Sequence, residues 1–251
     1  REVFVMKIVL KFKTDNNFIP KDYHRFCIKF FKTAVSNYSN GEFFEKFFGD
    51  DYIKSDEKKY SWAVKFFKPK FFSNRIEVGE NNFEITFKAP KTDVGTIFFN
   101  SFLEYKDKEF KISENNFIVL TDAKIVNEKK IVGNCARFKF CSPLVIREHN
   151  REDNTDRHIT VEDKDFFDKF KENLKIHFPN YSNSIDNMKI DISEMKKAVV
   201  LFYGLYIDVS LGVIVIKADN SLLNEMLISS VGSKNASGFG LLQLIESWEM
   251  K

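Results

Sequence analysis

The chain has 251 residues, 43% hydrophobic and 30% charged, so it can bury one large core or two small ones and lies outside the composition of disordered proteins. A net charge of only +3 neither requires nor excludes a polyanionic partner. The cysteines Cys27, Cys135 and Cys141 lack C-x-x-C spacing, which argues against a disulfide framework or a zinc site. Without a membrane-length apolar run or a secretion-signal pattern, we expect a cytoplasmic protein with no membrane partner.

The first half of the chain combines strand and helix patterns. Every second residue is apolar over residues 4–12, which predicts a half-buried strand. After Pro20 apolar residues recur at three- and four-residue steps up to Tyr38, which predicts an amphipathic helix. A short helix over residues 43–48 should end at Gly49. The other elements expected in this half are strands over 61–67 and 83–87, a helix capped by Asp93 and a strand over 117–125.

The second half repeats this order. The elements expected there are a strand over 135–141, a helix capped by Asp163, strands over 197–206 and 207–217, a helix from Ser221 and a strand over 239–248. Two βαββαβ units in tandem predict an α+β protein of two ferredoxin-like modules. We place the modules at residues 1–130 and 131–251, with the boundary near residues 127–133, where the polar stretch 127–130 lies. Proteins of this fold have many different activities, so the fold alone does not identify the function.

The most informative motif is the glycine-rich segment 231–240, between the last helix and the last strand. Glycines allow close approach of the backbone to a ligand and positive φ. Backbone N–H groups freed in this way can hold phosphate oxygens, and Lys234 adds a positive charge. The segment is neither a P-loop nor a Rossmann fingerprint, because it follows a helix and precedes a strand. A flexible turn without a ligand is the simpler interpretation.

This segment resembles the C-terminal glycine-rich loop of CRISPR repeat-processing endoribonucleases, which has the order glycine, apolar, glycine, five residues, glycine, aromatic, glycine. The chain matches from Gly232 onward, with Gly238 and Gly240 in register, and has Ser230 where the family has its first glycine. Weaker similarity extends over almost the whole chain, in segments 19–23, 66–72, 85–87, 140–145 and 170–174.

The resemblance implies metal-independent cleavage of CRISPR repeat RNA without a cofactor, leaving 2′,3′-cyclic phosphate and 5′-OH ends. It implies repeat RNA as the partner, with an effector complex as a further one, for a monomer or homodimer. Such chemistry needs a general base, an acid and cations for the phosphate. Within the loop, the residues expected to contact RNA are Gly232, Ser233, Lys234, Gly238, Phe239 and Gly240.

The catalytic candidates come from the first helix and its surroundings. The family often places its active histidine on this helix or in the next loop, and loop 36–41 contains none. His24, expected at the margin of the helix's apolar face, is therefore the candidate base. Tyr38 would orient the substrate or share the acid–base work, and Lys46 would stabilise phosphate charge. A packed or surface histidine, a packed tyrosine and a solvated lysine are the simpler alternatives.

Several cations and aromatic residues are candidates for binding RNA. Arg25 and Lys29 lie on the outer face of the first helix. Further basic residues that could follow a phosphate backbone are Lys32, Lys65, Lys68, Lys70, Arg147, Arg151 and Arg157. Exposed phenylalanines would stack unpaired bases. His149 and His158 read as solvated residues of a polar loop, and His177 as a packed side chain near a helix C-terminus.

Two other functions remain open from the sequence. The chain could be a tandem ferredoxin-like subunit that holds CRISPR RNA without cutting it, because the loop after the first helix lacks a histidine. It could also be a ligand-binding or regulatory protein of the same fold with no role in RNA metabolism.

Overall fold

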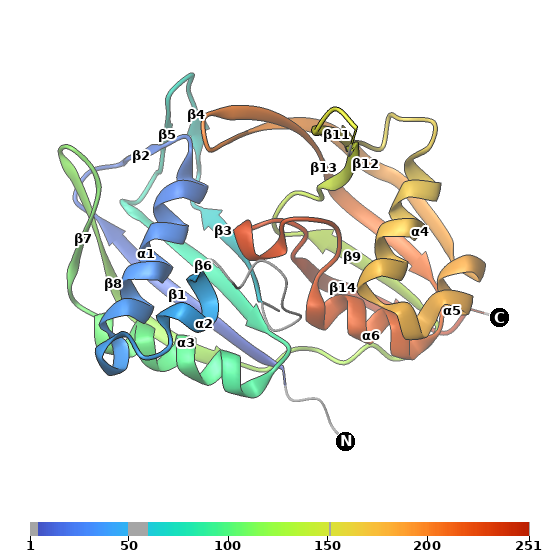
Figure 1. Cartoon of the computed structure of the whole chain (residues 1–251), viewed down its shortest axis with the longest axis horizontal. Helices are drawn as coiled ribbons and strands as arrows, with labels where there is room; N and C mark the ends of the chain where they lie inside the picture. Colours follow the sequence, from blue (N-terminus) through green and yellow to red (C-terminus); the bar gives the residue numbers. More distant parts are fainter. Residues whose placement is uncertain (1–4, 50–59, 151, 251) are drawn as a thin grey trace. The chain divides into compact units, whose positions relative to one another are not determined.

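The computed structural model describes residues 5–49, 60–150 and 152–250 of the chain. The chain forms two compact units (Figure 1). The first comprises Arg1–Asn127 with Leu201–Leu205, and the second Glu128–Val200 with Tyr206–Lys251. The membership of 201–205 in the first unit was not expected, because these residues connect two strands of the second half. Among the described helices, none combines the length and apolar character needed to cross a lipid bilayer.

The first unit is built on an antiparallel sheet of five strands in the order β3-β6-β1-β8-β7. Its strands are β1 (Met6–Thr14), β3 (Ser61–Phe66), β6 (Asn82–Ala89), β7 (Glu109–Ser113) and β8 (Asn116–Val126). The predicted alternation in β1 is confirmed, because Ile8, Leu10 and Phe12 are buried. Without its edge strand β7, the sheet has the strand order of a ferredoxin-like module.

Two helices, α1 (Tyr23–Asn37) and α3 (Thr92–Tyr105), lie side by side over one face of this sheet (Figure 1). Aromatic rings fill the space between them and the sheet, with Phe31 and Phe98 both against Phe87, at centroid distances of 5.8 and 4.7 Å. Phenylalanine side chains therefore make up much of this core. The helix cap was predicted wrongly, because Lys91 is the N-cap of α3 and Asp93 lies in its first turn.

Two smaller elements complete the first unit. The short helix α2 (Phe44–Phe48) ends at Gly49, as predicted. A three-stranded sheet in the order β2-β5-β4 consists of β2 (Phe18–Pro20), β5 (Arg75–Glu77) and β4 (Lys70–Phe71). One face of this sheet is fixed by the buried pair Ile19 and Ile76, which lie opposite each other in the register.

The second unit has the same topology, with the sheet order β12-β13-β9-β14. Its strands are β9 (Cys135–Phe140), β12 (Lys189–Phe202), β13 (Leu205–Lys217) and β14 (Leu242–Trp248). Its helices are α4 (Phe166–His177), α5 (Ser182–Asn187) and α6 (Asn220–Ser229). The buried residues of these helices form one apolar core with those of β9, β13 and β14. The predicted fold class, two tandem ferredoxin-like modules, is thus confirmed.

Several boundaries in this half differ from the prediction. The hairpin of β12 and β13 turns at Tyr203 and Gly204, between the two strands, rather than after residue 206. Asp165, rather than Asp163, is the N-cap of α4, and α6 begins at Asn220, one residue before the predicted Ser221. The segment read as a polar loop contains a strand pair, β10 (Ile146–Asn150) with β11 (Thr155–Ile159).

Candidate nucleic-acid interface

Main-chain hydrogen bonds tie the glycine-rich segment 231–240 to the chain that leads into β10. Val231 N donates to Gly240 O at 3.1 Å, which closes the loop on itself. Gly240 N donates to Pro143 O at 2.8 Å, and Ser233 N to Val145 O at 2.7 Å. Both ends of the loop are therefore buried, whereas residues 233–237 are partly exposed.

The glycines of the loop make this close packing of the backbone possible. Gly232 and Gly240 have φ of 83° and 72°, a region that favours glycine. A Cβ on Gly240 would overlap the carbonyl oxygen of Val231, and one on Gly232 would lie 2.7 Å from the carbonyl oxygen of Val145. Gly232, Gly238 and Gly240 are buried. Close packing thus gives these glycines a structural role, and their contact with RNA stays a prediction.

Of the other predicted loop contacts, Phe239 is also buried, with 0% of its surface exposed, so it cannot stack on a base. Ser233 and Lys234 are partly exposed. The hydroxyl of Ser233 accepts hydrogen bonds from the backbone N–H of Arg147 at 3.4 Å and from Asn173 Nδ2 at 3.3 Å. Ser233 thus fixes the loop to both β10 and α4.

Beside this loop, four polar side chains share one face of the β10–β11 hairpin. Arg147 lies opposite His158 in the register, and His149 lies opposite Asp156. Because opposite residues and residues two apart along a strand share a face, all four side chains project to the same side. Asp156 Oδ1 lies 2.8 Å from His149 Nδ1, and its Oδ2 accepts from Arg147 Nη1 at 3.3 Å.

The charge of Lys234 influences the pKa values of groups on this face. The hydrogen bond from His149 lowers the pKa of Asp156 most, and the charges of Arg147 and Lys234 lower it further. Burial lowers the pKa of Lys234, as does the nearby charge of Arg147. Burial also lowers the pKa of His158, and the charges of Lys234 and Arg147 act in the same direction. The charges of Arg147 and Lys234 thus both act on the Asp156 carboxylate.

Arg157, from the same segment, has its own acidic partners and does not add to the cluster. Arg157 forms ion pairs with Asp165 at 2.8 Å, Asp163 at 3.1 Å and Glu148 at 3.6 Å, so its charge is already matched. Arg151, a predicted RNA contact, lies outside the described residues.

The structure places His24 inside the first unit. Its side chain is 0% exposed and is enclosed by the rings of Tyr23 at 4.1 Å, Phe202 at 5.6 Å and Trp62 at 5.7 Å. The expected position at the margin of the apolar face is therefore wrong. A general base must come within hydrogen-bond reach of the proton it removes, and in this structure the His24 ring has no exposed surface.

The two remaining catalytic candidates are held by neighbours. The hydroxyl of Tyr38 accepts a hydrogen bond from Asn100 Nδ2 at 3.2 Å, and Lys46 pairs with Asp93 at 3.6 Å. Because His24 and Tyr38 stand at opposite ends of α1, about 21 Å of helix separates them. The structure therefore does not unite the three candidates in one site.

The outer cations of α1 lie one turn apart. Arg25 pairs with Asp22 at 3.6 Å, and its guanidinium lies 5.2 Å from the ring centre of Tyr203. Lys29 is exposed on the same side of the helix.

His177, predicted as packed, is exposed at the end of α4.

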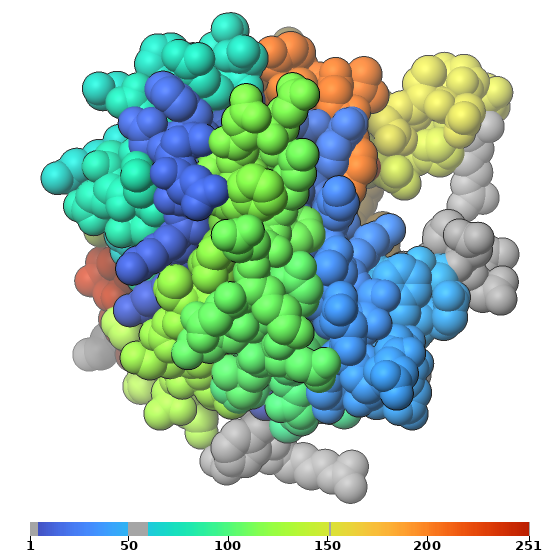
Figure 2. Space-filling view, turned by 90° about the vertical axis from the view of Figure 1, so that its left-hand side faces the viewer, coloured from blue at the N-terminus to red at the C-terminus, as the bar shows by residue number. Residues whose placement is uncertain are grey.

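Exposed phenylalanines gather on the small sheet of the first unit. Phe71 is 65% exposed, and Phe72 and Phe18 are 41% and 37% exposed. The guanidinium of Arg75 lies 4.2 Å from the ring centre of Phe18 and 5.3 Å from that of Phe72. Figure 2 shows the teal segment that includes β4 and β5 standing at the upper left of this face. Stacked aromatic and guanidinium planes are suited to unpaired bases.

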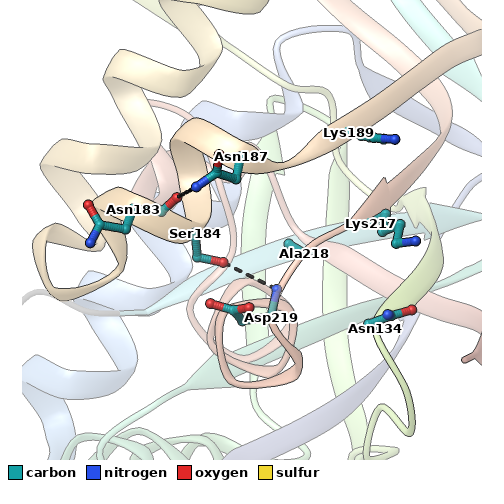
Figure 3. A pocket seen from close by; sticks show the side chains of 8 residues that line it. All are labelled: Asn134, Asn183, Ser184, Asn187, Lys189, Lys217, Ala218 and Asp219. Atoms are coloured by element: carbon teal, nitrogen blue, oxygen red, sulfur yellow. Dashed lines mark hydrogen bonds between the residues drawn. The ribbon is translucent and has the colours of Figure 1, made fainter. Parts of the chain in front are cut away.

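A polar pocket of about 300 Å³ in the second unit is a separate feature (Figure 3). Two internal hydrogen bonds cross its wall, from Asn187 Nδ2 to Asn183 O and from Asp219 N to Ser184 Oγ. It lies at the first residue of α6, whereas the glycine-rich loop follows the last, so about 15 Å of helix separates them.

Over residues 5–49, 60–150 and 152–250, no group of three or more His, Cys, Asp or Glu side chains could hold a metal ion.

Comparison with known proteins agrees with this fold. A family model described as CRISPR associated protein Cas6, C-terminal, matches residues 126–244, and the resemblance to repeat-processing proteins is thereby confirmed. An RAMP protein described as binding different RNA substrates is similar, with 21% identity, a TM-score of 0.77 and coverage of 96% of this chain and 100% of that one. A Cas6-related protein from Pyrococcus furiosus has 17% identity, a TM-score of 0.79 and coverage of 98% and 100%. At such identities the likeness shows the fold, and no curated protein sequence matches the chain.

The contact at Gly240 leads to a stability prediction. Gly240→Ala should lower the free energy of unfolding by more than about 3 kcal/mol, because the new Cβ both strains a positive φ and displaces the Val231 carbonyl. Gly204→Ala is the matched control, since Gly204 also has a positive φ but has nothing within 4 Å of its ideal Cβ, and it should cost only about 1–2 kcal/mol. Urea unfolding measures both. Equal losses would show that φ alone determines the requirement.

The environment of His158 predicts a pH dependence. Its folded pKa is lowered by burial and by Lys234 and Arg147, against opposing effects of Asp156 and Asp208. The unfolded chain therefore binds this proton more tightly, and stability is lost as the pH falls below about 6.5. The urea midpoint of the parent should decrease between about pH 7.5 and 5.5 more than that of His158→Gln. Parallel curves would contradict this account.

Proposed function

Because residues 126–244 carry the C-terminal domain of the Cas6 family of CRISPR repeat RNA-processing proteins, we propose that the chain binds CRISPR repeat RNA and cleaves it. One observation carries the proposal. Within the matched residues, Lys234 follows Ser233, which is hydrogen-bonded to Val145 and Arg147, so the glycine-rich loop lies beside the hairpin face that bears Arg147 and His158. Two cations and an imidazole next to partly exposed loop backbone form a site for an RNA phosphate.

The proposed reaction needs no metal. The ribose 2′-OH attacks the adjacent phosphate and leaves a 2′,3′-cyclic phosphate and a 5′-OH, as the family resemblance implies. The additional negative charge of the transition state is the part that fixed cations stabilise best. Arg147 and Lys234 supply such cations, and Arg147 is oriented by Asp156.

Other surfaces would hold the remainder of the RNA. Arg25 and Lys29 on α1 would attract the phosphate backbone of the RNA electrostatically. The exposed rings of Phe71 and Phe72, with Arg75 beside them, would stack unpaired bases. Both surfaces belong to the first unit.

The alternative is an RNA-binding subunit without nuclease activity. It is favoured by the burial of His24 and by the distance between His24 and Tyr38 along α1. A cleavage assay on repeat RNA separates this function from the first.

The phosphate contact of Lys234 is testable through salt. Lys234→Ala should weaken RNA binding regardless of sequence and reduce the slope of log K against log salt by about one. Lys108→Ala, which removes an exposed lysine from the first unit, is the matched control and should leave the slope close to that of the parent. Fluorescence anisotropy across several salt concentrations measures both. A parental affinity and slope for Lys234→Ala would exclude a backbone contact.

The catalytic assignment of His24 is tested by a change that keeps the aromatic packing. We expect the parent to cleave repeat RNA in excess chelator, and His24→Phe to retain the single-turnover rate within a few-fold, because the His24 ring is enclosed. A loss of about a hundredfold or more at unchanged RNA affinity would instead identify His24 as the general base.

Activity that disappears with chelator and returns with magnesium would exclude the metal-free reaction.

A further inference from the structure

We propose that the polar face of the β10–β11 hairpin is the catalytic centre of the RNA cleavage, with His149 as the general base. In this assignment Asp156 positions His149, while Arg147 and Lys234 hold the scissile phosphate. The inference rests on the proposed function and names the residues that perform it.

His149 has the geometry that a base requires. Asp156 Oδ1 lies 2.8 Å from its Nδ1, and a carboxylate at this nitrogen keeps the proton there and leaves Nε2 as the acceptor. Hydrogen bonding from His149 and the charges of Arg147 and Lys234 lower the pKa of Asp156, so the carboxylate remains ionised. The side chain of His149 is 37% exposed, whereas that of His24 is enclosed.

The same carboxylate places a cation beside the base. Asp156 Oδ2 accepts a hydrogen bond from Arg147 Nη1 at 3.3 Å, while Oδ1 contacts His149. Arg147 and His149 are two residues apart on one strand, a separation of about 7 Å that accommodates a phosphate and the adjoining 2′ oxygen. Lys234 approaches from the glycine-rich loop, close enough for its charge to act on Arg147 and Asp156.

The step balances with these groups. His149 Nε2 takes the proton of the 2′-OH as the 2′ oxygen forms a bond to phosphorus. The bond from phosphorus to the 5′ oxygen breaks, and the leaving oxygen keeps the electron pair and takes a proton from water. Arg147 and Lys234 stabilise the charge that develops on the phosphate oxygens. His158 shares this face, and burial lowers its pKa.

The test uses single-turnover cleavage, in chelator, of the repeat RNA transcribed from the CRISPR array of the source genome. His149→Ala should cleave about a hundredfold more slowly or worse, with RNA affinity changed by less than a few-fold. Added imidazole should restore part of the rate, because a free base can occupy the space left by the side chain. His177→Ala removes an exposed histidine from α4 of the same unit, and it should cleave like the parent and show no response to imidazole.

Asp156 requires a separate readout because it acts through His149. Asp156→Asn should lower the rate at saturating protein while the affinity for RNA stays within a few-fold, and Asp156→Glu should recover part of that rate. Thermal unfolding of each variant checks that it is folded. Replacing a partly exposed side chain of the hairpin such as His149 should lower the stability only slightly.

Each result supports or overturns the assignment. If the parent cleaves and His149→Ala cleaves equally fast, His149 is not the base, while the proposed function stands. If His149→Ala loses cleavage only in proportion to a loss of binding, it holds RNA and the assignment as base is overturned. If the parent binds repeat RNA and does not cut it, the nuclease function fails, and the inference fails with it.

Discussion

The glycine-rich loop and the polar hairpin depend on one short stretch of backbone, residues 142–145. Pro143 and Val145 offer their carbonyls to the loop, at Gly240 and Ser233, and the chain continues directly from Val145 into β10. Carbonyls that approach this closely leave no space for a Cβ at Gly232. Main-chain hydrogen bonds on both sides of Lys234 therefore fix the position of the loop backbone beside the hairpin.

This arrangement separates the structural part of the motif from the chemical part. The three glycines and Phe239 are buried and make the loop fold back on itself. Ser233 and Lys234 occupy the partly exposed section between them, and Lys234 itself has a left-handed φ of 62°. The glycines thus determine where a cation is presented, and their influence on RNA is indirect. A sequence pattern dominated by glycine consequently marks a position in the fold more than a set of ligand contacts.

The sequence predicted the elements whose apolar residues are periodic, and it failed where structure comes from distant partners. Residues 146–159 have an apolar residue at each end and polar ones between, so the strand pair formed by backbone register gave no alternation to detect. His24 was misplaced because one wall of its enclosure is Phe202, far along the chain. The glycine motif was found, but its burial depends on carbonyls from another segment, which spacing alone does not reveal.

The dual role of Asp156 has a consequence for how the proposed centre would work. Its two oxygens contact a histidine and an arginine, so one carboxylate fixes both the orientation of the base and the position of a phosphate-binding cation. Groups that share such a partner do not contribute independently, and their effects on the transition state are not additive. Binding and proton transfer would therefore be coupled through a single side chain on β11. That coupling would hold the base and the phosphate-binding cation in a fixed relation on the hairpin.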